Sequence, residues 1–231
     1  MNKEVHFEDL GREDYKVVWD YQESLFKSII QDKIKNRREN AGLITQNHLL
    51  LVEHDHVYTL GKSGDLENLL ANQKQLDSIN ATFYKINRGG DITYHGPGQI
   101  TGYPILDLEN FFTDIHKYLR LLEEVFVAIL ADYDLRGERS PGETGVWLDV
   151  GTPFARKICA LGVRASRWVT MHGFAFNVNT DLGYFDHIIP CGIKDKSVTS
   201  LEAELGRTVN PQEIKEKIKA YFTAQFGAIL V

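Results

Sequence analysis

The chain has 231 residues, of which 43% are hydrophobic and 25% charged, a composition typical of one folded domain rather than a disordered chain. Its net charge of −6 argues against general nucleic-acid binding, which needs a basic surface. The longest apolar run has seven residues, 125–131, far short of the roughly 20 that cross a bilayer. The acidic N-terminus lacks the apolar segment of a targeting signal, and two cysteines cannot form a disulfide framework. We therefore expect a single domain over 1–231, in the cytoplasm and not on a membrane.

The first half of the chain predicts two long helices separated by short strands. Val18, Tyr21, Leu25 and Ile29 recur at helical spacing, and so do apolar residues further along. Between them lie short apolar runs and a glycine-rich segment. In chain order, the pattern predicts a helix at 13–33, strands at 48–52, 57–60 and 82–86, the glycine-rich segment at 88–102, an extended segment at 103–108 and a helix at 115–132.

The second half predicts strands followed by two short helices. Segments 145–149, 157–163 and 169–178 are rich in β-branched and aromatic residues. Thr199 and Glu202 have the spacing of a capping box, with Gly206 ending that helix, and Asn210–Pro211 begins the last one. Strands and helices intermix without regular alternation, which favours an α+β fold with a mixed β-sheet flanked by helices.

The charge is unevenly distributed. No Asp or Glu occurs from 150 to 180, whereas Arg156, Lys157, Arg164 and Arg167 do. Such a cationic stretch in an acidic chain suggests a site for an anionic ligand or an acidic partner. A buried strand pair that excludes acids explains the pattern equally well.

Glycine is concentrated in the segment RGGDITYHGPGQ, which runs from Arg88 to Gln99. Glycine allows close approach of the backbone to a ligand and lets successive N–H groups point into one cavity. The segment lacks the Gly–Lys–Ser/Thr of a phosphate-binding loop. A tight turn between strands is the alternative.

The two cysteines occupy different contexts. Cys191 lies between Pro190 and Gly192 on a predicted turn, followed by Lys194 and Lys196, and cationic surroundings lower the pKa of a thiol. Cys159 has the setting of a buried small hydrophobe. On a strand, Lys157 would share a face with Cys159, Leu161 and Val163, where a surface-edge lysine is the alternative to a functional one.

The histidines do not predict a metal site. His54 and His56 form an H-x-H pair, but no Cys or acidic cluster completes a zinc set at a familiar spacing. His95 and His172 each lie beside a glycine and suit either substrate binding or proton transfer. A hydrogen-bonded strand histidine is the alternative for His172.

In combination, these segments resemble the bacterial octanoyltransferases of lipoate synthesis, formally lipoyl(octanoyl) transferases. The elements EHDHVYTLG, RGGDITYHGPGQITGYPILDL, TGVWLD, RKICALGVR, HGFAFNVNTDL and IIPCGI occur in the order of that family, over about 50–205. The resemblance implies a fold like that of biotin and lipoate protein ligases. It also implies transfer of an octanoyl group from acyl carrier protein to a lysine on lipoyl domains, such as those of 2-oxoacid dehydrogenases or the glycine cleavage H protein, with no cofactor.

The resemblance also assigns residues. Cys191 corresponds to the cysteine that carries the acyl group as a thioester, and Lys157 to the lysine that activates it. The residues implied to line the acyl pocket are Arg88, Gly89, Gly90, Asp91, Ile92, Thr93, Tyr94, His95, Ala160, Leu161, Gly162, Gly173, Phe174 and Ala175. The segment 138–144 is less typical of the family.

Three other functions remain as alternatives. An ATP-dependent lipoate or biotin ligase would share the fold but needs no nucleophilic cysteine. A cysteine thioesterase would send the same acyl-enzyme to water. A non-catalytic acyl- or carrier-binding module would need no thiol chemistry at all.

Overall fold

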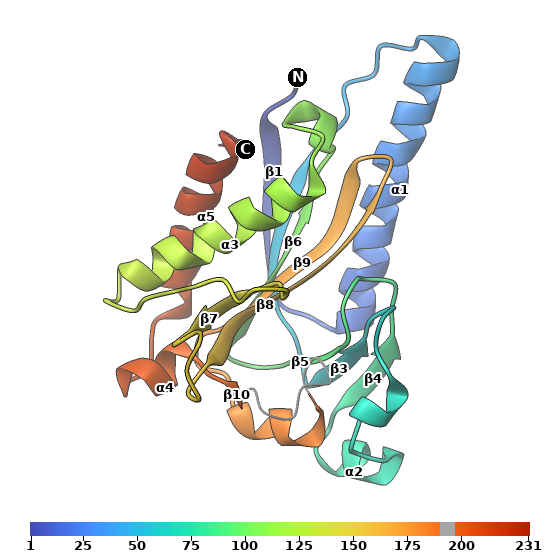
Figure 1. The fold of residues 1–231 in the computed structure, drawn as a ribbon. Helices are drawn as coiled ribbons and strands as arrows, with labels where there is room; N and C mark the ends of the chain where they lie inside the picture. Colours follow the sequence, from blue (N-terminus) through green and yellow to red (C-terminus); the bar gives the residue numbers. More distant parts are fainter. Residues whose placement is uncertain (190–196) are drawn as a thin grey trace.

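The computed structural model describes residues 1–189 and 197–231, and its centre is a mixed eight-stranded sheet (Figure 1). Seven strands follow the order β10-β8-β9-β6-β2-β1-β11, and β7 pairs with the outer side of β8. Neighbours from β8 through β9 and β6 to β2 are antiparallel, whereas β1 pairs in parallel with both β2 and β11. The strands are β1 (Glu4–Arg12), β2 (His48–Glu53), β6 (Gln99–Ile105), β7 (Val146–Leu148), β8 (Arg156–Ser166), β9 (Val169–Asn177), β10 (Ser197–Val198) and β11 (Ile229–Leu230).

Helices cover both faces of this sheet. The long helix α1 (Tyr15–Glu39) packs Val18, Phe26 and Ile29 on one face, against β2, β6 and β9. Helices α3 (Ile115–Ala131) and α5 (Pro211–Phe226) cover the other face, and Figure 1 shows them across the sheet from α1. The short helix α4 (Leu201–Leu205) follows β10.

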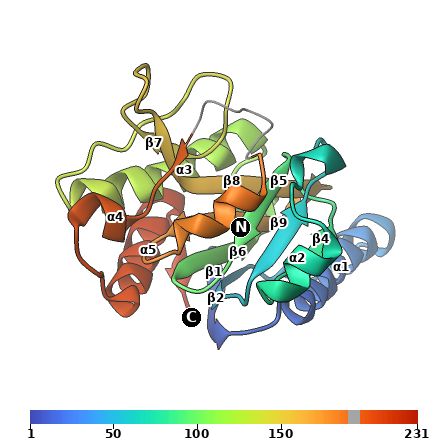
Figure 2. The same ribbon diagram turned by 90° about the horizontal axis from the view of Figure 1, so that it is seen from below.

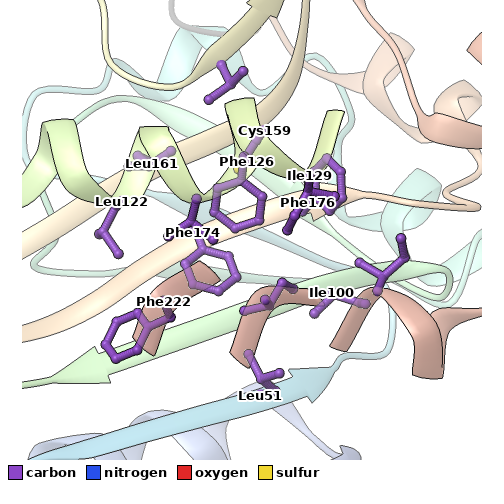
Figure 3. Packing of buried hydrophobic residues seen from close by; sticks show 14 of the residues in the cluster. Leu51, Ile100, Leu122, Phe126, Ile129, Cys159, Leu161, Phe174, Phe176 and Phe222 are labelled. Carbon is purple, nitrogen blue, oxygen red and sulfur yellow. The ribbon is translucent and has the colours of Figure 1, made fainter. Parts of the chain in front are cut away.

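The main core lies between the sheet and helices α3 and α5 (Figure 3). Phe126 of α3 packs its ring against two strand residues, with ring centroids 4.6 Å from Phe174 and 5.0 Å from Phe176. Phe222 of α5 joins the same cluster and is fully buried. Burial of these large side chains determines which face of β8 and β9 packs against helices α3 and α5.

A second, three-stranded sheet lies next to the first, with the order β4-β3-β5 (Figure 2). The chain passes from β2 into β3 and from β5 into β6 within a few residues, so the two sheets share two connections. Its strands are β3 (Val57–Leu60), β4 (Thr82–Lys85) and β5 (Ile92–His95). The short helices α2 (Gln73–Ser78), η1 (Leu66–Asn68) and η3 (Leu182–His187) accompany them, and another short helix, η2 (Leu108–Asn110), follows β6.

The predicted helices and strands are largely confirmed, although the short elements α2, β10 and β11 were not predicted and three further differences have a local cause. Helix α1 continues beyond the predicted end at 33 and stops at Asn40, which has the left-handed φ of 51°. Strand β1 was not predicted, because only Val5 and Phe7 alternate with polar residues before Glu8 and Asp9 break the pattern. The N-cap of α4 is Ser200 rather than Thr199: the Ser200 hydroxyl accepts from the N–H of Ala203, while Thr199 donates to Glu204.

None of the helices in the described part of the chain has both the length and the apolar character that a membrane-crossing segment needs. The division into one domain over 1–231 stays a prediction.

Candidate active site

A cavity opens between the two sheets, beside the N-terminal end of α1. Strands β5, β6, β8 and β9 all contribute to its walls, together with the segment between β4 and β5. Its lining residues are Tyr15, Arg88, Gly90, Asp91, Ile92, Thr93, His95, Gln99, Tyr103, Thr144, Lys157, Ala160, Leu161, Gly162, His172, Gly173, Phe174, Ala175, Asn177, Phe185 and Val198.

The structure therefore brings Lys157 and nearly all of the predicted pocket residues to one cavity. The exceptions are Gly89 and Tyr94. The N–H of Gly89 donates to the carbonyl oxygen of Val163 over 2.9 Å, which attaches the glycine-rich segment to β8. Tyr94 faces the core of the small sheet, where its ring stacks on Tyr184.

Small residues on the neighbouring strands β8 and β9 leave room for the cavity. Ala160 of β8 lies opposite Ala175 of β9, and both line the cavity. The next pair along, Cys159 and Phe176, points into the core instead. A Cβ atom on Gly162 would lie 3.0 Å from Cδ of Arg88, so glycine is what lets this arginine lie against β8.

Arg88 brings a buried cation to the cavity. Its Nη2 donates to the backbone oxygen of Thr59 over 2.8 Å and to the Thr59 hydroxyl over 3.1 Å, and its Nη1 donates to Gly89. These bonds hold the guanidinium between β3 and the glycine-rich segment. The sequence alternative of a simple tight turn is wrong for this segment, because it forms β5 and a wall of the cavity.

Three buried histidines surround the cavity in their neutral form. His95 donates from Nδ1 to Gln99 over 2.8 Å, and burial is the main cause that lowers its pKa to about 3. Burial likewise lowers the pKa of His54 to about 4 and that of His172 to about 3. His172 donates from Nε2 to Asn87 and has a φ of 58°, an uncommon conformation for a residue inside a strand.

Both ring nitrogens of His54 are already used, since Nδ1 donates to the carbonyl of Glu13 and Nε2 accepts from the Tyr103 hydroxyl. Among residues 1–189 and 197–231, no three His, Cys, Asp or Glu side chains converge to hold a metal ion.

Lys157 reaches the cavity because of an irregularity in β8. One step along β7, from Val146 to Trp147, corresponds to two steps along β8, from Cys159 to Lys157. The additional residue, Ile158, forms a β-bulge, so Ile158 and Cys159 both enter the core. The prediction that Lys157 shares a face with Cys159 is therefore wrong. Its Nζ lies 4.6 Å from the centroid of the Trp147 ring.

Cys191, with Lys194 and Lys196, lies outside the described residues. The described chain on either side is tied to the cavity region. The N–H of Ile189 donates to the carbonyl oxygen of Asn68 over 2.8 Å. Val198 pairs with Lys157 and lines the cavity. The other cysteine, Cys159, is confirmed as a buried small hydrophobe, and burial raises the pKa of its thiol.

Two arginines of the cationic stretch, Arg156 and Arg164, are held in ion pairs, whereas Arg167 is exposed. Arg156 donates to both carboxylate oxygens of Glu204 over 2.6 Å and pairs with Asp149. Arg164 pairs with Glu23 of α1 over 2.7 Å. The alternative of a buried strand pair explains the absence of acids better, because β9 is buried along its whole length.

Several lining residues were missed. Tyr15, Tyr103, Thr144 and Phe185 are single residues that no motif in the sequence connected with the site. Gln99 closes the glycine-rich segment and donates from Nε2 to Asn177 over 2.8 Å, a cross-strand pair that no sequence spacing signals.

Comparison with known proteins identifies the family. Residues 14–223 match the family described as the lipoyl protein ligase A/B catalytic domain. The chain belongs to this family. A relative named octanoyltransferase from Christiangramia forsetii is 70% identical over 100% of this chain and 99% of its own length. Another protein of that name, from Flavobacterium johnsoniae, is 70% identical over 100% of both chains.

Solved structures agree on the fold of this lipoyl ligase family member. A bipartite lipoate protein ligase from Thermoplasma acidophilum superposes with a TM-score of 0.71 at 16% identity, covering 100% of this chain and 86% of that one. Lipoate-protein ligase A bound with ATP superposes with a TM-score of 0.66 at 14% identity, over 100% and 90% of the two chains. The expected fold and the expected acyltransferase class are both confirmed.

Proposed function

We propose that the chain transfers an octanoyl group from octanoyl-acyl carrier protein to a lysine of lipoyl domains, through a thioester on Cys191. The acceptors in this proposal are the lipoyl domains of 2-oxoacid dehydrogenases and the glycine cleavage H protein, in the cytoplasm. The octanoyltransferase relatives, at 70% identity over the full chain, support octanoyl transfer and lipoyl-domain substrates. The observation that carries the mechanism is the placement of Lys157 in the wall of a cavity in which Ala160, Gly162 and Ala175 leave space.

The cavity suits a medium-length acyl chain. Ile92, Phe174 and Phe185 supply apolar walls, while Ala160 and Ala175 leave room between them. Burial of each methylene is worth about 0.8 kcal/mol, so a seven-carbon tail provides several kcal/mol of binding free energy. Acyl transfer then proceeds on a substrate whose reactive carbonyl is held in one place.

The reaction divides into two thioester steps. In the first, the Cys191 thiolate attacks the thioester carbonyl of the donor, the carrier's thiolate leaves and takes a proton from the Lys157 ammonium, and the acyl group is bound to the cysteine. In the second, the acceptor lysine amine attacks this new thioester, an amide forms, and the Cys191 thiolate leaves again. An amide is more stable than a thioester, so the transfer needs no ATP.

Lys157 serves both steps in this proposal. As an ammonium it stabilises the thiolate, and as a neutral amine it accepts the proton that the acceptor lysine must lose. The face of the Trp147 ring against Nζ attracts the cationic form and limits where the amine can lie.

The test is transfer without ATP. We expect purified protein, octanoyl-acyl carrier protein and an isolated lipoyl domain to yield octanoylated domain, measured by intact mass, with Lys157→Ala slower by about 100-fold or more. Product that forms only from free octanoate and ATP would instead indicate a ligase. Free octanoate with no modified domain would indicate a thioesterase.

A further inference from the structure

A carboxylate outside the cavity holds the chain segment that flanks Lys157. Glu123 of α3 is fully buried, and a buried carboxylate is costly unless donors satisfy it. Arg120 and Arg139 donate to its Oε2 over 2.7 and 3.0 Å. Its Oε1 accepts from the backbone N–H of Gly145 over 3.0 Å.

Gly145 links this carboxylate to Lys157. It has a φ of 110°, and a Cβ atom there would lie 2.5 Å from the backbone oxygen of Cys159 and 3.5 Å from Cδ and Cε of Lys157. Gly145 therefore lies beside the methylene stem of the lysine, with no more than a side chain's width between them. Two residues further on, the ring of Trp147 faces the lysine Nζ. On the other side of Gly145, the Thr144 hydroxyl donates to the carbonyl oxygen of Leu161, and Thr144 lines the cavity.

We propose that Glu123 is a positioning residue, which holds the amine of Lys157 at its place in the cavity by fixing the backbone of 144–147. The inference rests on the proposed function, because it assigns Glu123 a role through Lys157. Glu123 itself touches neither the cavity nor the substrate. Its two arginines balance its charge, and its second oxygen is left to orient Gly145.

The substitution Glu123→Gln tests this arrangement sharply. A glutamine has one oxygen and one NH₂ group where the glutamate has two oxygens. If its oxygen faces the arginines, its NH₂ faces the N–H of Gly145; if it is turned round, the NH₂ faces a guanidinium. Either orientation sets two donors against each other, so Gly145 or the arginines must move. Glu123→Asp keeps the charge but is one methylene too short to reach both partners.

The neighbouring residue provides a matched control. Glu124 accepts from the same Arg139 over 2.5 Å but is 40% exposed and makes no described hydrogen bond to Gly145. Glu124→Gln therefore removes a similar ion pair and leaves the backbone of 144–147 in place.

The experiment follows iodoacetamide alkylation of Cys191 against pH by peptide mass mapping, together with steady-state transfer kinetics, below the unfolding midpoint of each variant. We expect Glu123→Gln and Glu123→Asp to raise the pH of half-maximal alkylation, and to lower kcat by about 10-fold while KM for the donor changes less than about 2-fold. Glu124→Gln should match the unsubstituted protein.

Two results would overturn the inference. If both Glu123 variants lower only the unfolding midpoint, Glu123 has a purely structural role. If Lys157→Met also leaves the alkylation profile unchanged, the proposed role of Lys157 fails, and the inference fails with it.

Discussion

The two faces of the β8–β9 pair differ in what covers them, although alternate residues of the same two strands form both. On one face, Cys159 and Phe176 pack beneath Phe126 of α3 in a closed core (Figure 3). On the other, Ala160 and Ala175 lie opposite each other beside an open cavity. The alternation of a strand thus places the closed core on one face and the cavity on the other. Substitutions on the two faces should therefore have separable effects.

The largest effect is expected on the core face. Phe126→Ala removes a fully buried ring between Phe174 and Phe176, and should lower the free energy of unfolding by about 3–5 kcal/mol. Urea denaturation measures this. Val17→Ala, at an exposed position of α1, should change the free energy by less than about 0.5 kcal/mol. Equal effects of the two substitutions would contradict a core centred on α3.

Adjacent residues of β8 give the sharpest contrast between the faces. Ala160→Leu places a large side chain in the cavity, and should reduce octanoyl transfer by about 100-fold while altering unfolding by less than about 1 kcal/mol. Cys159→Ala should do the reverse, lowering stability by about 1–2 kcal/mol and leaving transfer within about 2-fold. Transfer kinetics and urea denaturation of both variants measure the two effects. A stable, fully active Ala160→Leu would contradict the proposal that the face of Ala160 borders the acyl site.

Acid should act through the histidines around the cavity. His54, His95 and His172 have pKa values lowered by burial to about 4, 3 and 3, so below about pH 6.5 the unfolded chain binds protons that the folded chain does not. Stability is therefore full above about pH 6.5 and falls as the pH decreases toward 5. Each histidine contributes up to about 1.4 kcal/mol per pH unit.

Denaturation at several pH values tests this. His95→Gln should reduce the slope between pH 6.5 and 5, whereas His116→Gln, on the exposed surface of α3, should not. A slope that stays the same in His95→Gln would show that His95 is not buried in its neutral form.

The smallest effect is expected on β8 beyond the cavity. Arg164→Ala removes the ion pair with Glu23 and the contact with the Phe26 ring, and should cost about 1 kcal/mol of stability. Thermal unfolding in low and high salt measures it. Arg167→Ala, at an exposed position of the β8–β9 turn, should be neutral.

Most of the fold and much of the cavity could be predicted from the sequence. Periodicity located α1 and α3, whose apolar faces are patterned, and a high content of β-branched and aromatic residues located β8 and β9. The resemblance brought together Arg88 and His95 with Lys157 and Ala160, two pairs from distant parts of the sequence that meet in one cavity.

The remaining features of the site depend on a strand irregularity and on contacts between residues distant in the sequence, which local sequence patterns do not predict. The bulge at Ile158 turns Lys157 away from the face of Cys159, and strict alternation cannot reveal it. The partners of Arg156 and Arg164 lie in α4 and α1, so the charge count alone gave the wrong expectation for both. The bond from Glu123 to Gly145 likewise joins residues that are close only after folding.

The most direct test of the account is the intact mass of the protein after incubation with octanoyl-acyl carrier protein, followed by peptide mapping. The account predicts a single octanoyl group on Cys191, absent in Cys191→Ser and slower to form in Lys157→Ala. An octanoyl group on another residue, or undiminished transfer to the lipoyl domain by Cys191→Ser, would contradict it.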